Sequence, residues 1–207
     1  EPVTAYAGAW PASDAEKEAL EGMLFDPTGE RFTVTNTYST NQYGEVGLAL
    51  GDTPLIQPTE VADAQDLAAI AAVEADNAAR AITLDDGSST DYTRSQFLTP
   101  PYVSNADPVR VGATATFTEP VVLTEGGSPS SPTYRFQPTT SVSGPDYTTT
   151  SPAVFENTRT AAPEEVGGDL SVASFNVLNY FTTLGDADDD NVGDDGCQAY
   201  VDRDGDG

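Results

Sequence analysis

Apolar and polar residues alternate along residues 109–117, "VRVGATATF", and this period of two constrains the fold more than any other feature of the chain. Such alternation is typical of a β-strand with one buried face. Residues 31–39 and 44–50 alternate in the same way, and a turn-like segment lies between them. The pattern therefore predicts a strand in each of these three segments. The expected buried face of residues 109–117 consists of Val109, Val111, Ala113, Ala115 and Phe117.

Two segments predict helix instead of strand. Residues 63–81 are rich in alanine and contain neither glycine nor proline, and Asp63 stands where an N-cap is expected. Ser13 is followed three residues later by Glu16, which is the capping-box pattern of a helix start. The apolar side of the longer helix would consist of Leu67, Ile70 and Ala71.

Two further strands complete the predicted set. Residues 81–88 predict a short strand and a turn, and residues 133–138 place Tyr134 and Phe136 on one face. The Gly- and Ser-rich residues 125–132 predict a turn or a hairpin tip. About five short strands, with one helix inserted between the second and the third, suit a mainly β fold. The closest type is a small barrel of the oligonucleotide/oligosaccharide-binding kind, the OB-fold, in which closure removes exposed edges.

Charge and composition argue against two classes of partner. Lys and Arg total 8 against 34 Asp and Glu, which gives a net charge of −26. The few cations are scattered, so there is no basic stripe for binding nucleic acid through counterion release. No apolar run approaches the roughly 18 residues that a membrane-spanning helix needs. The chain starts at Glu1 and stops in "DRDGDG", and we interpret it as a piece of a longer protein.

Residues 139–169 predict little regular structure, and "LSVASFNVLNYFTTL" follows at residues 170–184. This stretch begins like a strand that is covered on both faces. Asn176 and Asn179 interrupt it where a core strand would carry apolar residues. An amide offers one acceptor and two donor hydrogens, so it can hold a phosphate oxygen without adding charge. The plain alternative is that both amides cap the strand end and bond the following loop.

The same stretch resembles the first strand of the endonuclease/exonuclease/phosphatase superfamily, and especially of the large secreted bacterial extracellular nucleases within it. Six upstream segments resemble the barrel domain that precedes the catalytic domain in those nucleases. The resemblance implies a linker at 1–17, an OB-fold-like barrel at 18–160, a linker at 161–169 and the first strand of a truncated α/β-sandwich nuclease domain at 170–207. The upstream segments are "LEGMLF" (20–25), "VTNTYSTNQYGEVGLA" (34–49), "QPTEV" (57–61), "AITLDDGS" (81–88), "VRVGATAT" (109–116) and "YRFQPT" (134–139).

A function also follows from the resemblance: a secreted metal-dependent nuclease that hydrolyses the phosphodiester bonds of nucleic acid. Asn176 would belong to its metal and phosphate site, with Asn179 as a neighbour of the phosphate or metal. A divalent metal, Mg²⁺ or Ca²⁺, would polarise the phosphoryl oxygen, and a histidine would activate the attacking water. The sequence contains no histidine, so the remaining machinery would lie past residue 207 and this piece alone would be inactive.

The segment after Gly185 holds nine aspartates. Its final "DRDGDG" fits the start of a calcium loop, in which Asp202, Asp204 and Asp206 would be oxygen ligands of a structural Ca²⁺. A solvated surface loop is the plain alternative. Cys197 is the only cysteine, and the resemblance implies that it forms a disulfide with a cysteine beyond residue 207, as suits an extracellular setting.

Two other functions stay open from the sequence. A non-catalytic OB-like module would bind single-stranded nucleic acid or a sugar polymer by stacking on aromatic side chains, although these residues equally suit the core or rim. The scarcity of cations argues against strong nucleic-acid binding by the barrel, whose ligand the sequence does not identify. A calcium-stabilised extracellular surface protein would rest on the aspartate-rich tail alone. The candidate stacking residues are Tyr38, Tyr43, Tyr134 and Phe136.

Overall fold

The computed structural model describes residues 3–94, 99–102, 107–140, 142, 151–162, 164–165, 167–170, 172, 174 and 176. The chain divides into two compact units, Glu1–Arg159 and Thr160–Gly207. All the helices and strands of the described residues lie in the first unit, which is mainly β as the alternation predicts.

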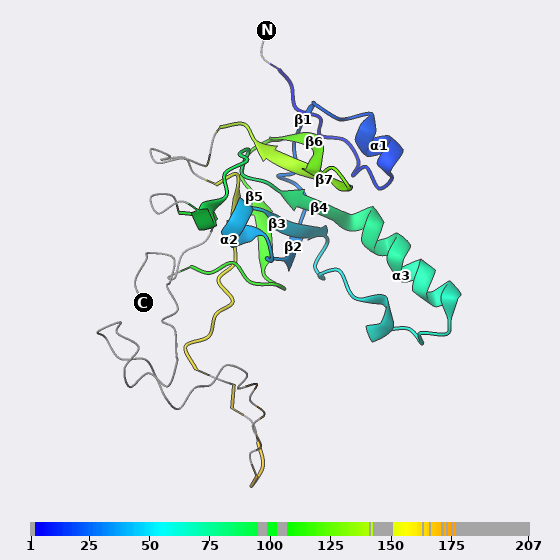
Figure 1. Ribbon diagram of the computed structural model, residues 1–207, viewed down its shortest axis with the longest axis vertical. Helices are drawn as coiled ribbons and strands as arrows, with labels where there is room; N and C mark the ends of the chain where they lie inside the picture. The colour runs from blue at the N-terminus through cyan, green and yellow to red at the C-terminus, as the bar shows by residue number, and fades with distance from the viewer. Residues whose placement is uncertain are drawn as a thin grey trace, which may run out of the picture. The chain divides into compact units, whose positions relative to one another are not determined.

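The first unit is built on one eight-stranded sheet (Figure 1). Its strands are β1 (Leu24–Phe25), β2 (Phe32–Asn36), β3 (Val46–Leu50), β4 (Ala81–Leu84), β5 (Thr114–Phe117), β6 (Val121–Ser128), β7 (Ser131–Pro138) and β8 (Ala153–Phe155). The helices are α1 (Asp14–Glu18), α2 (Thr40–Tyr43) and α3 (Leu67–Arg80), with 3-10 turns η1 (Pro58–Glu60) and η2 (Tyr92–Arg94).

The strands follow the order β1-β6-β7-β4-β3-β2-β5-β8. All described pairings between these strands are antiparallel except that of β4 with β7. β6 and β7 form a hairpin whose register ends at Ser128↔Ser131, so the hairpin tip predicted within residues 125–132 is confirmed. The helix predicted between the second and third strands is also confirmed, as α3 lies between β3 and β4. The described pairings leave β1 and β8 at the two edges, so they do not close the sheet.

The strand predicted over residues 109–117 is shorter than the alternation suggests. β5 begins only at Thr114, and Val111 is 55% exposed. Gly112 has a φ of +88°, a left-handed conformation that interrupts an extended strand. Its backbone N–H donates to Val34 O over 2.8 Å, and Val34 N–H donates to Ala113 O over 2.8 Å. The alternation is therefore correct for Ala113, Ala115 and Phe117. Val109 is partly buried against the core as well, so the prediction is wrong only for Val111.

Three strands were not predicted at all: β1, β8 and β6, whose residues 125–128 belong to the segment expected to form a turn. β1 has two residues and β8 has three, and a period of two cannot be recognised over so few positions. β8 lies within the segment expected to lack regular structure, yet it pairs with β5 from Ala115↔Phe155 to Phe117↔Ala153. β1 and β8 form because they pair with strands that lie far away in the sequence.

The two helix starts have different outcomes. The capping box is confirmed, because Glu16 N–H donates to Ser13 Oγ over 3.3 Å and Ser13 N–H donates to Glu16 Oε2 over 2.9 Å. The prediction of Asp63 as the N-cap is wrong, because the N-cap of α3 is Asp66, three residues later. Asp66 Oδ1 accepts from Ala69 N–H over 3.0 Å, whereas Asp63 Oδ1 accepts from Gln65 N–H and stabilises the preceding turn.

Helix α3 does not bury the apolar side expected for it. None of its residues is fully buried, and Leu67 is 75% exposed. The end of α3 that carries Leu67 extends away from the strands, while its other end leads directly into β4 (Figure 1). Its attachment therefore depends on hydrogen bonds near Arg80 more than on apolar packing.

The expected linker at residues 1–17 packs against the sheet instead. Tyr6 forms a β-bridge with Phe25, and Lys17 is only 3% exposed. The ring of Trp10 meets Phe32 edge-on at a centroid distance of 5.7 Å. Aromatic residues of this kind bury too much surface to be left in a solvated connector.

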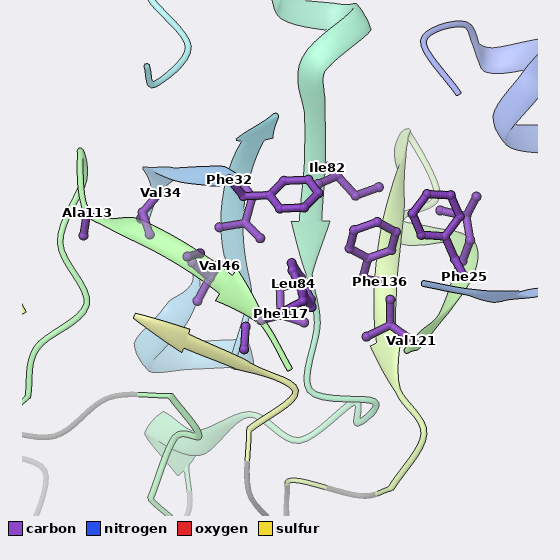
Figure 2. Close-up of a cluster of buried hydrophobic side chains, with 14 residues drawn as sticks. Phe25, Phe32, Val34, Val46, Ile82, Leu84, Ala113, Phe117, Val121 and Phe136 are labelled. Carbon is purple, nitrogen blue, oxygen red and sulfur yellow. The ribbon is translucent and has the colours of Figure 1, made fainter. Parts of the chain in front are cut away.

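Aromatic side chains from distant strands meet in one core. The ring centroids of Phe32 and Phe117 lie 5.2 Å apart, those of Phe25 and Phe136 lie 5.4 Å apart, and those of Phe32 and Phe136 lie 6.0 Å apart. Figure 2 shows Phe32, Phe136 and Phe25 following one another across this core. Because these residues come from β1, β2, β5 and β7, the sheet is curled so that one face encloses its own core.

The described residues of the second unit do not show the expected buried strand. Leu170 is 82% exposed and Val172 is 87% exposed, and neither belongs to a strand. A strand covered on both faces needs partner strands and a covering layer, and the described residues of this unit supply neither.

Candidate functional site

The site residues predicted from the sequence are placed only in part. Asn176 is exposed and lies outside helices and strands. Asn179, Cys197, Asp202, Asp204 and Asp206 lie outside the described residues. Within the described part of the chain, no group of three or more His, Cys, Asp or Glu could hold a metal ion.

A different polar site forms where three neighbouring strands bring charged residues together. Glu45 directly precedes β3 and Asp85 directly follows β4, and these antiparallel strands pair Val46 with Leu84. Both carboxylates therefore lie at the same end of the strand pair. β7 runs parallel to β4 with Thr83 opposite Arg135, so the guanidinium reaches this end as well.

The three side chains form a buried ion-pair cluster. Arg135 Nη1 donates to Glu45 Oε1 over 3.0 Å and also to Asp85 Oδ2. Arg135 Nη2 donates to Thr133 Oγ1 over 3.2 Å. Arg135 is 6% exposed and Asp85 is 5% exposed. One guanidinium thus faces two carboxylates, and the cluster carries a net negative charge.

Two glycines make room for this arginine on the neighbouring strand β6. A Cβ at Gly126 would lie 3.2 Å from Arg135 Cδ, and a Cβ at Gly127 would overlap Arg135 Nη2. Gly127 also has a φ of +96°, which side chains rarely adopt. The Gly-Gly pair therefore provides the space that the guanidinium occupies.

An open cleft of about 680 Å³ lies over Arg135. Most of its lining residues are polar or small. They include Glu45, Asp85 and Gln137, together with Arg135 and Tyr43. The lining also includes four serines, Ser39, Ser88, Ser89 and Ser128. Arg135 Nε and Gln137 Oε1 are buried and have no hydrogen-bond partner among the described residues, which leave one donor and one acceptor unsatisfied.

A second layer of buried polar groups supports the loop after β4. Asp86 is fully buried, where Tyr92 Oη donates to its Oδ2 and Ser88 N–H donates to its Oδ1 over 2.8 Å. Burial, reinforced by the charge of Asp85, raises the pKa of Asp86, and the two hydrogen bonds oppose this shift. Tyr102 Oη donates to Asp85 O over 2.8 Å, and burial raises the pKa of Tyr102 well above its usual value.

The four aromatic residues proposed for stacking lie in different parts of the fold. Phe136 is buried in the core, and Tyr134 Oη donates to Glu18 Oε2 over 3.0 Å. Tyr38 is 91% exposed and does not line the cleft over Arg135. Tyr43, at 39% exposure, lies on the wall of that cleft.

Sequence reasoning missed this cleft because it treated Arg135 as one of several scattered cations. Alternation in "TYRFQP" places Phe136 inside and therefore Arg135 outside, where an arginine is normally solvated. The available signal was the combination of "EGGS" and "YRF" across one hairpin, which places glycines beside the arginine. The partners Glu45 and Asp85 could not be assigned without the order of the strands.

Comparison of the chain with protein-family models, curated proteins and solved structures finds no match. None of the helices in the described part of the chain has the length and apolar character needed to cross a bilayer.

Proposed function

We propose that this chain is the accessory part of a secreted metal-dependent nuclease, with an OB-fold-like barrel at residues 18–160 and the start of a nuclease domain at 170–207. The observation that carries the proposal is the strand order of the first unit, which lies just upstream of the "FNVLNYF" motif. The motif supplies the resemblance to nucleases, and the strand order supports the barrel that accompanies it.

The strand order supports an OB-like barrel through the relation of β1 to β2. Only residues 26–31 join them, yet β1 pairs with β6 and β2 pairs with β3. If β1 and β2 are treated as two halves of one bent strand, the order β2-β3-β4-β7-β6-β1 begins and ends with that same strand. That is the connectivity of a partly open five-stranded barrel. The aromatic contacts between Phe25, Phe32 and Phe136 across the core fit the same arrangement.

The described residues do not by themselves fit the metal that the nuclease function requires. Asn176 offers one amide oxygen, a ligand type that suits Mg²⁺ or Ca²⁺, and the described residues provide no acidic cluster to complete a site. The catalytic metal would therefore be held mainly by groups outside these residues. The 207-residue chain alone is expected to be inactive.

Plasmid nicking by the native protein that carries this chain tests the function. We expect nicking with Mg²⁺ or Ca²⁺, none after chelation, and none by the 207-residue chain alone. Asn176→Ala should lower the rate by about 10²-fold, the typical effect of removing one group that stabilises the transition state. Asn41→Ala, at another exposed asparagine, is the matched control. Nicking that resists chelation would overturn the metal-dependent mechanism, and full activity of Asn176→Ala would remove that residue from the site.

A non-catalytic OB-like binding module is the second candidate function, and the cleft over Arg135 favours it. OB-folds bind oligonucleotides and oligosaccharides on their barrel face and adjoining loops. The cleft lies between the β2–β3 connection, the segment after β4 and the β6–β7 hairpin. A calcium-stabilised surface protein has no comparable support among the described residues.

A further inference from the structure

We propose that the cleft over Arg135 binds a neutral, hydroxyl-rich ligand, namely an oligosaccharide. The proposal deepens the binding-module function and is independent of the nuclease function. It rests on four properties of the cleft: its charge, its unsatisfied polar atoms, its aromatic wall and its size.

The charge of the cleft disfavours anionic ligands. Among the described residues of the lining, Arg135 carries the only guanidinium, and it already donates to Glu45 and Asp85, so these residues offer a phosphate no unpaired cation. The side chain of Glu45 is 25% exposed, and its carboxylate would repel an anion. A net charge of −26 over the whole chain adds to this repulsion. An uncharged ligand is not subject to this electrostatic repulsion.

The unsatisfied polar atoms match hydroxyl chemistry. Arg135 Nε can only donate and Gln137 Oε1 can only accept, and both side chains lie on the same face of β7. A hydroxyl group donates and accepts at once, so a polyol can satisfy both kinds of group once the lining side chains shift to admit it to these buried atoms. The serine hydroxyls of the lining and the exposed part of Glu45 offer further partners. Carboxylate and amide groups of the lining can hydrogen-bond the ligand's neutral hydroxyls and so orient the ligand, which needs no charge of its own.

Tyr43 supplies a flat wall for a sugar ring. Tyr43 as a residue is 39% exposed, and its hydroxyl accepts from Gln42 Nε2 over 3.1 Å. Gln42 Nε2 also donates to Asp91 Oδ2 over 3.1 Å, which holds the amide in place. A pyranose carries C–H groups on one face, and an aromatic ring with a polar tip packs well against such a face. The wall is therefore oriented before the ligand arrives.

The size of the cleft also fits. A volume of about 680 Å³ accommodates a short oligosaccharide, and it falls within the roughly 300–1,000 Å³ of typical ligand sites. The glycines beside Arg135 keep the floor low, since a larger residue at either position would push the guanidinium into this space.

A glycan array probed with the labelled 207-residue chain tests the proposal. Neutral glycans should bind, whereas sulfated or uronic glycans and oligo-dT should not. Titration with the best neutral hexasaccharide should then show that Tyr43→Ala raises Kd about tenfold, the equivalent of about 1.4 kcal/mol. Tyr38→Ala is the matched control, because Tyr38 is an exposed tyrosine outside the cleft, and its Kd should equal that of the wild type. Circular dichroism verifies that both variants are folded.

Three results would overturn the proposal: no neutral glycan bound, oligo-dT or anionic glycans bound more tightly than neutral ones, or equal Kd values for Tyr43→Ala and Tyr38→Ala. A failure here leaves plasmid nicking by the native protein unaffected, so the two proposals fail separately. Glu45→Gln provides a further check, because it removes the charge that repels anions while keeping an acceptor. It should preserve binding of the neutral hexasaccharide.

Discussion

The indole Nε1 of Trp10 donates to the carbonyl oxygen of Ala79 over 2.7 Å and thereby ties the N-terminal segment to the last turn of α3. Lys17 Nζ donates to the neighbouring carbonyl of Ala78 over 3.2 Å. Carbonyls of a last helical turn lack partners within the helix, and a cation there also interacts favourably with the helix dipole. Together with the bonds from Arg80 Nη1 to Leu50 O and Thr53 O, these two bonds attach a helix without buried residues to the sheet.

Replacing Trp10 by phenylalanine should lower the free energy of unfolding by about 1–2 kcal/mol, because a smaller aromatic ring still packs there and the part-buried carbonyl of Ala79 loses its donor. Trp10→Ala should cost about 3–5 kcal/mol, since it also leaves a cavity beside Phe25 and Phe32. Urea unfolding followed by far-UV circular dichroism measures both, because Trp10 is the only tryptophan and its fluorescence is lost. Equal stability of Trp10→Phe and the wild type would show that the bond to Ala79 contributes nothing.

The β-strands with clear alternation could be predicted from sequence because the positions that face the core are apolar, although Thr33 and Ala49 on the other face are buried as well. β2, β3 and β4 are found where the pattern places them, and Phe32, Leu48 and Leu84 are buried there. The N-terminal segment could not be predicted, since Trp10 has no periodic neighbours and its role depends on Phe25, Phe32 and Ala79 being brought together by the fold.

The candidate site was hidden from sequence for a related reason. Glu45, Asp85 and Arg135 are separated by 40 and 50 residues, and only the order β7-β4-β3 makes them neighbours. The parallel pairing of β4 with β7 is the step that local patterns cannot supply. By contrast, the prediction for Asn176 rests on its sequence motif alone, and most of the motif lies outside the described residues.

Removing the guanidinium of the cleft should be strongly destabilising. Arg135→Met leaves the buried carboxylate of Asp85 without its ion-pair partner, which should cost about 3–5 kcal/mol of unfolding free energy. The double variant Arg135→Met/Asp85→Asn should recover part of this loss because neither charge of the Arg135–Asp85 pair remains buried. Arg94→Met is the control, since Arg94 is 84% exposed on the surface and its pair with Asp91 should contribute at most about 1 kcal/mol. Urea unfolding at neutral pH compares all three. Similar losses for Arg135→Met and Arg94→Met would contradict a structural role for the buried cluster.

The glycine beside Arg135 should tolerate no side chain. Gly127→Ala combines a strained positive φ with a Cβ that overlaps Arg135 Nη2, and this nitrogen cannot move freely because Thr133 and the carboxylates hold the guanidinium. A loss of about 1–3 kcal/mol is expected. Gly29→Ala is the matched control, because no atom lies within 4 Å of the added Cβ, and its effect should stay within about 0.5 kcal/mol. Thermal unfolding of the two variants under one set of conditions decides, and equal Tm values would show that the hairpin relaxes around the new methyl group.

Stability should depend on pH through Asp86. Burial raises the pKa of this carboxyl, so the folded state binds its proton more tightly than the unfolded chain does, where the pKa is near 3.9. The stability that it contributes is therefore full below about pH 4 and is lost as the pH rises through the folded-state pKa. Asp86→Asn stays neutral at every pH, and its amide can still bond Tyr92 Oη, so its unfolding free energy relative to the wild type should increase from pH 4 to pH 7. Asp52→Asn, at an exposed aspartate, changes the net charge equally and should show no such increase. Urea unfolding of the three proteins across this pH range measures the difference, and parallel curves for Asp86→Asn and Asp52→Asn would mean that Asp86 titrates as an ordinary surface carboxylate.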